Sequence, residues 1–82
     1  MYYLIMCRSL THAQRVANGL ERAGIPARIL RTPAAIAPSG CSHSVRIPGQ
    51  SLSRTLTTLN RLRLPHLGIY VGGAEGYREV EA

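Results

Sequence analysis

Short apolar runs with the composition of β-strands recur along the chain. The run YYLIMC at residues 2–7 is rich in β-forming residues and too short for a helix, which predicts a buried strand. A looser alternation of apolar and polar residues predicts a second strand within residues 25–32, and short runs predict two more at residues 44–47 and 67–71. A marginal further strand is expected at residues 77–80, inside a polar C-terminal stretch.

Two other segments carry the spacing of an amphipathic helix, with apolar residues three and four positions apart. The first covers residues 11–23, with Ser9 or Thr11 as its N-cap and Gly24 where a helix C-terminus favours positive φ. The second covers residues 50–64 and carries a stripe of leucines. The positions expected to pack on the sheet are 13, 16, 17, 20 and 23 in the first helix and 52, 56, 59 and 62 in the second.

The predicted order of elements, β-α-β-β-α-β, is that of the ferredoxin-like arrangement. We therefore expect an α+β fold with a four-stranded antiparallel sheet in the order 4-1-3-2 and both helices on one face. The chain is predicted to form a single domain over residues 1–82, with a polar C-terminal tail from about residue 72. Strands 1 and 3 are neighbours in this topology, so Cys7, residues 9–12 and residues 41–43 should gather at one end of the sheet.

The composition adds a strong positive charge to this picture. All ten basic residues are arginines and the formal net charge is +6, which favours anionic partners such as phosphate, nucleic acid or an acidic protein. Two cysteines are too few for a disulfide-stapled secreted scaffold, and the longest apolar run is far too short to cross a membrane. No secretory leader is apparent, so we expect a cytoplasmic protein without a membrane anchor.

Cys41 stands in the stretch APSGCSHS, where proline, glycine and serine disfavour regular structure. A cysteine reacts as its thiolate, and a helix N-terminus or a nearby cation lowers the pKa of the thiol. The unpaired N–H groups of the first helix could stabilise such an anion, and His12 or His43 could donate a hydrogen bond or transfer a proton. Gly40 would let the backbone approach a partner closely. The alternative is that Cys41 is an inert loop thiol.

The segment around this cysteine also resembles a known family. Residues 9–47 are similar to the DUF3343 family of selenium or sulfur carrier-like proteins, and the matching elements occur in the family's order: Thr11-His12, Ala23-Gly24-Ile25-Pro26, Thr32-Pro33, and Cys41 followed by Arg46. The chain departs from the family pattern at Ser42, where the family tends to have glycine, and at Leu10, which interrupts the Ser-Thr-His element. Cys7 is an additional thiol that the pattern does not contain.

The resemblance implies a small carrier, rather than a stand-alone enzyme, that holds sulfur or selenium on Cys41 as a covalent persulfide or selenide. It implies no other cofactor, and a protein partner that donates or accepts the sulfur or selenium. Cys7 is the candidate resolving thiol, which would form a disulfide with Cys41. The candidate binding residues around the carrier thiol are Thr11, His12, Gly40, Ser42 and His43.

Several other functions are alternatives. Thiolates and imidazoles at one end of the sheet could bind Zn²⁺ or Cu⁺, but the chain has no C-x-x-C pair, so no metal is expected. The main alternative is a basic protein- or RNA-interaction module without thiol chemistry, although the strand at residues 44–47 offers no aromatic ring to stack a base. The absence of aspartate, of paired carboxylates and of a phosphate-binding loop argues against independent catalysis. An exposed sheet edge would allow a homodimer.

Overall fold

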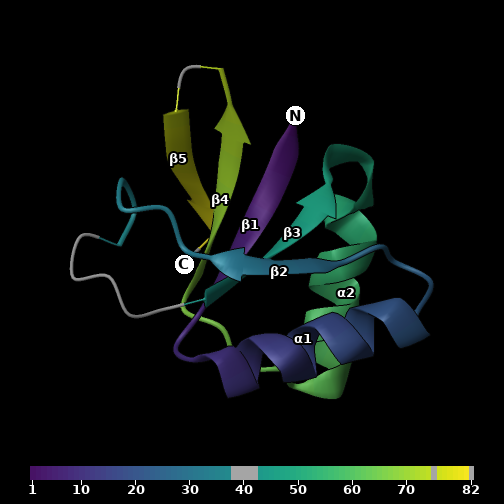
Figure 1. Ribbon diagram of the computed structural model, residues 1–82. Helices are drawn as coiled ribbons and strands as arrows, with labels where there is room; N and C mark the ends of the chain where they lie inside the picture. The colour runs from purple at the N-terminus through teal and green to yellow at the C-terminus, as the bar shows by residue number, and fades with distance from the viewer. Residues whose placement is uncertain (38–42, 75, 82) are drawn as a thin grey trace.

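The computed structural model describes residues 1–37, 43–74 and 76–81, in which two α-helices accompany one five-stranded antiparallel sheet (Figure 1). The predicted α+β class is confirmed. Neither described helix is long and apolar enough to cross a membrane. The elements, in chain order, are β1 (Tyr2–Cys7), α1 (Leu10–Arg22), β2 (Arg28–Arg31), β3 (His43–Pro48), the 3-10 turn η1 (Gly49–Ser51), α2 (Leu52–Leu62), β4 (Gly68–Gly73) and β5 (Gly76–Glu81).

The sheet has one strand more than the predicted four-stranded arrangement, and this strand confirms the marginal one expected at residues 77–80. Its order is β2-β3-β1-β4-β5, so the first four strands follow the expected 4-1-3-2 order and β5 is added beside β4 (Figure 1). The chain turns back near Gly76, which has φ +103°, and the backbone of β5 then pairs with β4 over a stretch that we expected to be a polar tail. The four-stranded ferredoxin-like prediction is therefore wrong in strand number, because an edge strand can be held by backbone pairing with few apolar side chains.

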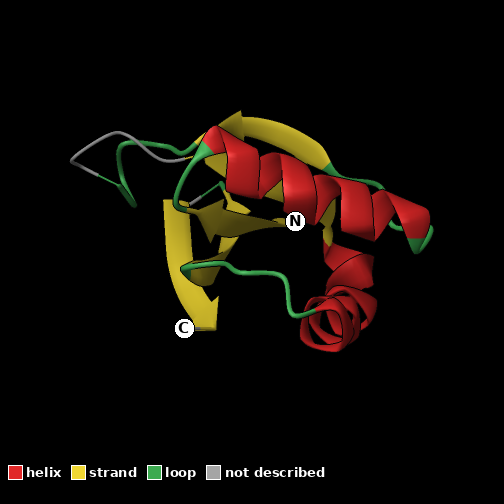
Figure 2. Cartoon of the chain, turned by 90° about the horizontal axis from the view of Figure 1, so that it is seen from below, coloured by secondary structure: helices red, strands yellow, loops and turns green. Residues whose placement is uncertain are grey.

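The pleat of the sheet separates a core face from a face that turns away from the helices. In the central strand β1, Ile5 and Cys7 are fully buried on the core face, whereas Leu4 alternates to the other face. Ile5 lies opposite Val45 of β3 and Ile69 of β4, so three neighbouring strands present apolar side chains to the same side. Residues of both helices join this core cluster, and Figure 2 shows the two helices beside the sheet.

Helix α1 follows the predicted pattern closely. Ser9 is its N-cap, and the Ser9 hydroxyl accepts a hydrogen bond from the backbone N–H of His12 at 3.3 Å. The helix ends before Gly24, which has φ +83°, and the N–H of Ile25 donates to the carbonyl of Leu20 at 2.9 Å. The predicted apolar stripe supplies the buried residues Ala13, Val16, Ala17 and Leu20.

Helix α2 is shorter than predicted, and three of the four leucines in its predicted stripe contact the core cluster. It begins at Leu52, after η1, and ends at Leu62 because Arg63 adopts the left-handed conformation with φ 53°. Its buried residues are Thr55, Thr58 and Leu59, and Leu52 and Leu56 pack partly buried against the core, whereas Leu62 is 42% exposed. The leucine stripe thus mispredicts Leu62, which lies in the last turn, and misses two threonines that complete the buried face.

Candidate functional site

One end of the sheet brings together a thiol, histidine side chains and a helix N-terminus. Cys7, at the end of β1, lies opposite His43, at the start of β3. Helix α1 begins just after β1, and β4 starts at the same end because Gly68 pairs with Met6. This end of the sheet therefore holds one of the two thiols, the N-terminus of α1 and all three histidines of the chain, His12, His43 and His66.

Cys7 is an enclosed thiol. Its side chain is 0% exposed, and its Sγ lies 3.6 Å from the carbonyl oxygen of Ile5. Burial disfavours the charged thiolate and raises the pKa of Cys7 to about 11. At neutral pH this group is therefore a neutral thiol, which is a poor nucleophile.

We expect Cys7 to resist alkylation in the folded protein. In a Cys41→Ser protein, where Cys7 is the only thiol, iodoacetamide labelling near pH 8 should be at least about 100-fold slower natively than in concentrated urea. The factor follows from the rise of the Cys7 pKa from 9.0 to about 11, which lowers the fraction of Cys7 present as thiolate about 100-fold. Mass spectrometry of timed samples gives both rates, and equal rates would contradict the enclosed position of Cys7.

The N-terminus of α1 is organised by the Ser9–His12 pair. The Ser9 Oγ lies 2.9 Å from the Nδ1 of His12, in addition to accepting from the His12 backbone N–H. Since the Ser9 oxygen already accepts one hydrogen bond, its hydroxyl proton can be donated to Nδ1, which leaves the proton of the neutral ring on Nε2. His12 would then present an N–H donor away from the cap.

His43 lies at the same end of the sheet as the N-terminus of α1. It is half-buried at the first residue of β3 and lies opposite both Cys7 in β1 and Arg31 in β2. Its Nδ1 is buried and has no hydrogen-bond partner among the described residues. His43 is two positions from Cys41 in the chain, so its imidazole is available for a partner in that neighbourhood.

A small cavity of about 170 Å³ lies at the same end of the sheet. Arg8, His12 and His66 line it together with Pro65 and Leu67. The Nδ1 of His66 lies 3.2 Å from the carbonyl oxygen of Leu64, so the ring is held in place. Sequence reasoning missed Arg8 and His66 as site residues, because their proximity depends on the approach of the chain to β4, and nothing in the linear pattern indicates it.

The segment that carries Cys41 is closed at its base by a buried hydrogen bond. Thr32 follows β2 and Ser44 is the second residue of β3, and their hydroxyl oxygens lie 2.7 Å apart. Thr32 is 5% exposed and Ser44 is 0% exposed. This contact fixes the distance between Thr32 and Ser44, the two residues that flank the segment containing Cys41. The Thr-Pro element at residues 32 and 33 was the sequence signal that could have identified Thr32.

The other predicted site residues have mixed outcomes. Thr11 is exposed on the first turn of α1. Gly40, Cys41 and Ser42 lie outside the described residues. Within the parts of the chain that the structure describes, no group of three or more His, Cys, Asp or Glu side chains is placed to hold a metal ion.

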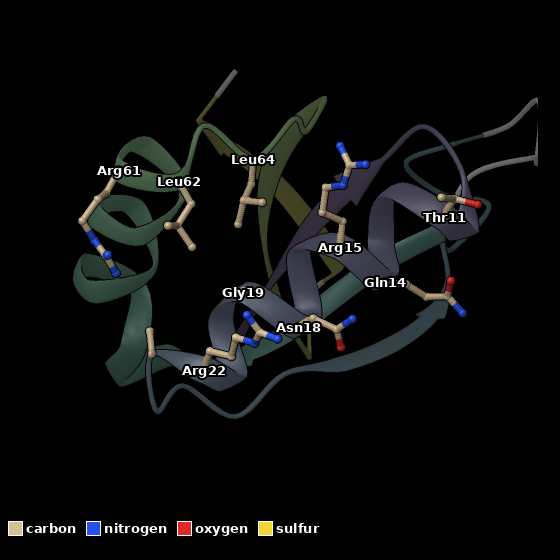
Figure 3. Close-up of a pocket in the computed structure, with 10 residues that line it drawn as sticks. Thr11, Gln14, Arg15, Asn18, Gly19, Arg22, Arg61, Leu62 and Leu64 are labelled. Atoms are coloured by element: carbon tan, nitrogen blue, oxygen red, sulfur yellow. The ribbon is translucent and has the colours of Figure 1, made fainter.

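A separate groove runs between α1 and the C-terminal end of α2 (Figure 3). Its volume is about 630 Å³, and its lining includes three arginines, Arg15, Arg22 and Arg61, as well as Leu62 and Leu64. Figure 3 shows these side chains coming from both helices and from the residues that follow α2. The groove combines positive charge with apolar surface, and neither Cys7 nor His43 is among its lining residues.

No curated protein and no solved structure matches the sequence significantly. The family described as "Putative Se/S carrier protein-like" matches residues 2–71, a range that includes β1, both helices, the Cys41 segment and most of β4. Because this match covers most of the 82 residues, the chain belongs to the family of selenium and sulfur carrier-like proteins.

Proposed function

We propose that this protein carries sulfur or selenium on Cys41 and passes it to a protein partner, without acting as a stand-alone catalyst. The observation that supports this assignment is the contrast between the two thiols of a chain that belongs to a carrier-like family. Cys7 is enclosed and its pKa is raised to about 11, so it cannot readily accept a chalcogen from a partner. Cys41 is the other cysteine, and it lies in a segment rich in glycine, serine and proline that can be presented to a partner's pocket.

Loading would proceed by thiol–persulfide exchange. The Cys41 thiolate attacks the terminal sulfur of a persulfide on a donor cysteine, a new S–S bond forms on Cys41, and the donor cysteine leaves as a thiolate. The step needs no external oxidant or reductant, because the sulfur moves from one thiolate to another. Delivery to an acceptor is the same step in reverse, and a selenium cargo follows the same balance.

The groups at the adjoining end of the sheet would favour the charged form of the cargo. The free N–H groups of α1, the ring of His43, and Arg8 beside His12 are donors or cations that stabilise a persulfide or selenide anion. Thr11, Gly40 and Ser42 would complete the surroundings of the carrier thiol. No resident cofactor or metal is required for this chemistry.

Cys7 would act as a resolving thiol only after deprotonation. Its thiolate would attack the inner sulfur of the Cys41 persulfide, form a Cys7–Cys41 disulfide and release hydrosulfide. This disulfide needs the two Cα atoms within about 7 Å. The raised pKa of Cys7 makes disulfide formation slow at neutral pH, so it would be slower than transfer of the cargo from Cys41 to an acceptor. A reducing compartment such as the cytoplasm would keep both thiols free, and pairing of exposed sheet edges would allow a homodimer.

The test is mass spectrometry of the protein purified from its native cell without reductant. We expect the mass of one added sulfur or selenium atom on the peptide that contains Cys41, its loss in Cys41→Ser, and its retention in Cys7→Ala. The alkylation rate of Cys41 against pH should give an apparent pKa clearly below about 8.5. An apparent pKa at or above that value, with the added mass persisting in Cys41→Ser, would refute the assignment.

A further inference from the structure

The sheet face that turns away from the helices, called the open face below, carries three of the chain's four tyrosines. Strand alternation places Tyr2 on the same side as Leu4, opposite to the core. Tyr70 of β4 lies directly opposite Leu4. Tyr77 of β5 lies opposite Gly72, which is itself opposite Tyr2. The three tyrosines therefore come from three neighbouring strands and project from one surface.

Tyr2 is the centre of a fixed cluster on the open face. Its ring centroid is 6.4 Å from that of Tyr77 in an edge-on arrangement at 71°, and the two hydroxyl oxygens lie 3.1 Å apart. A Cβ on Gly72 would be 2.6 Å from the Tyr2 ring, so the ring rests against the backbone of β4. The guanidinium carbon of Arg46 lies 4.1 Å from the ring centroid of Tyr2. The guanidinium of Arg46 and the rings of Tyr2 and Tyr77 are therefore fixed in position on the open face.

The open face is also positively charged where the arginines of two strands meet. Arg28 of β2 lies directly opposite Arg46 of β3, and both side chains are exposed. Like charges at directly opposite positions of a sheet repel each other, so an anion bound between the two arginines would relieve this repulsion. Of the acidic residues, Glu79 lies opposite Tyr70 on the open face, at the sheet edge farthest from Arg28, and Glu21 of α1 borders the hollow beside Arg28.

Two surface hollows flank the Tyr2 cluster. One, of about 570 Å³, is lined by Tyr2, Arg28 and Arg46, among others. The second, of about 740 Å³, is lined by Gly72, Tyr77 and neighbouring residues of the β4–β5 hairpin. A chain that crosses the open face would find arginines in the first hollow and a tyrosine in the second.

We propose that the open face binds single-stranded nucleic acid. Arg28 and Arg46 contact backbone phosphates, and successive bases stack on the rings of Tyr70 and Tyr77 and on the guanidinium of Arg46. Aromatic rings and arginine planes on a sheet surface are the groups that bind unpaired bases, whereas a basic groove alone serves any polyanion. The missing ring in β3, which argued against this function from the sequence, is supplied by β1, β4 and β5.

The proposal does not depend on Cys41, so the test uses the Cys41→Ser protein alongside wild type. The probes are fluorescein-labelled oligouridine and oligothymidine of about 12 nucleotides, followed by fluorescence anisotropy at low salt. We expect both proteins to bind equally, and the tyrosine emission of this tryptophan-free chain to be quenched by unlabelled oligomer. Loss of carrier function in Cys41→Ser with retained binding would separate the two activities.

Matched variants test which groups bind. Arg46→Ala should weaken binding about tenfold and reduce the dependence on salt, because it removes a phosphate contact and a stacking plane. Tyr70→Leu should weaken binding at least about fivefold, whereas Tyr70→Phe, which keeps the ring, should stay within about twofold. Arg61→Ala is the charge control, since Arg61 is exposed at the C-terminal end of α2, on the helix side of the sheet, and it should also stay within about twofold. Circular dichroism verifies that each variant is folded.

Three results would overturn the proposal. The first is no binding of either oligomer by wild type at low salt. The second is equal binding of an abasic oligomer of the same length, which would show that the bases do not stack. The third is competition by polyglutamate as effective as that of oligouridine at equal charge, which would assign the face to an acidic protein instead.

Discussion

Replacing Leu20 by alanine is expected to lower the free energy of unfolding by about 2–5 kcal/mol. Leu20 is 0% exposed and belongs to the core cluster between α1 and the sheet. The substitution removes buried methyl groups and leaves a cavity, while alanine keeps the helix propensity of the site. Urea unfolding followed by far-UV circular dichroism measures the change. For a domain whose total stability is on the order of 5–15 kcal/mol, this is a large loss.

Leu62→Ala is the matched control, because it is the same substitution at the other helix. Leu62 is 42% exposed, so we expect the free energy of unfolding to fall by less than about 1 kcal/mol. The sequence pattern places both leucines in the core, whereas the structure places only Leu20 there. Equal losses for the two variants would therefore support the sequence pattern and contradict the observed position of α2.

The elements that the sequence predicts best are those in which several local signals agree. Helix α1 combines a regular apolar stripe with Ser9 at its start and Gly24 after its end, and its observed bounds lie within one residue of the prediction. Helix α2 lacks such signals. Its buried face contains Thr55 and Thr58, whose burial depends on where the helix lies on the sheet and not on their hydrophobicity. Strand β5 was predicted only as a marginal strand. Its pairing with β4 is made by backbone groups, which leave no apolar pattern in the sequence.

The candidate site could be predicted as far as topology alone determines it. Adjacent strands β1 and β3 bring Cys7 opposite His43, as their order implies. The full burial of Cys7, which raises its pKa, depends on packing by the core cluster and has no signature in the sequence. The Thr32–Ser44 contact depends on the exact register of β2 and β3, which a prediction of strand existence does not supply.

Breaking the Thr32–Ser44 hydrogen bond from one side is expected to destabilise the protein more than removing both partners. Thr32→Val keeps the shape of the side chain but leaves the buried Ser44 hydroxyl without its partner, and Ser44→Ala does the reverse. Each should lower the free energy of unfolding by about 1–3 kcal/mol. The double variant should lose clearly less than the sum, because no orphaned hydroxyl remains. Urea midpoints of the four proteins complete this double-mutant cycle.

The same cycle tests whether the contact matters for the proposed carrier. The contact joins Thr32 and Ser44, which flank the segment that contains Cys41, and the proposed carrier role needs these flanks to hold Cys41 near the donors at the end of the sheet. We therefore expect the apparent alkylation pKa of Cys41 to rise toward about 8.5 in the double variant. Thr57→Val is the control, since it removes a hydroxyl that donates to the Ser53 carbonyl on the exposed side of α2, and it should leave that pKa unchanged. Additive losses in the cycle, with an unchanged Cys41 pKa in the double variant, would mean that the bond neither couples the two strands nor positions the thiol.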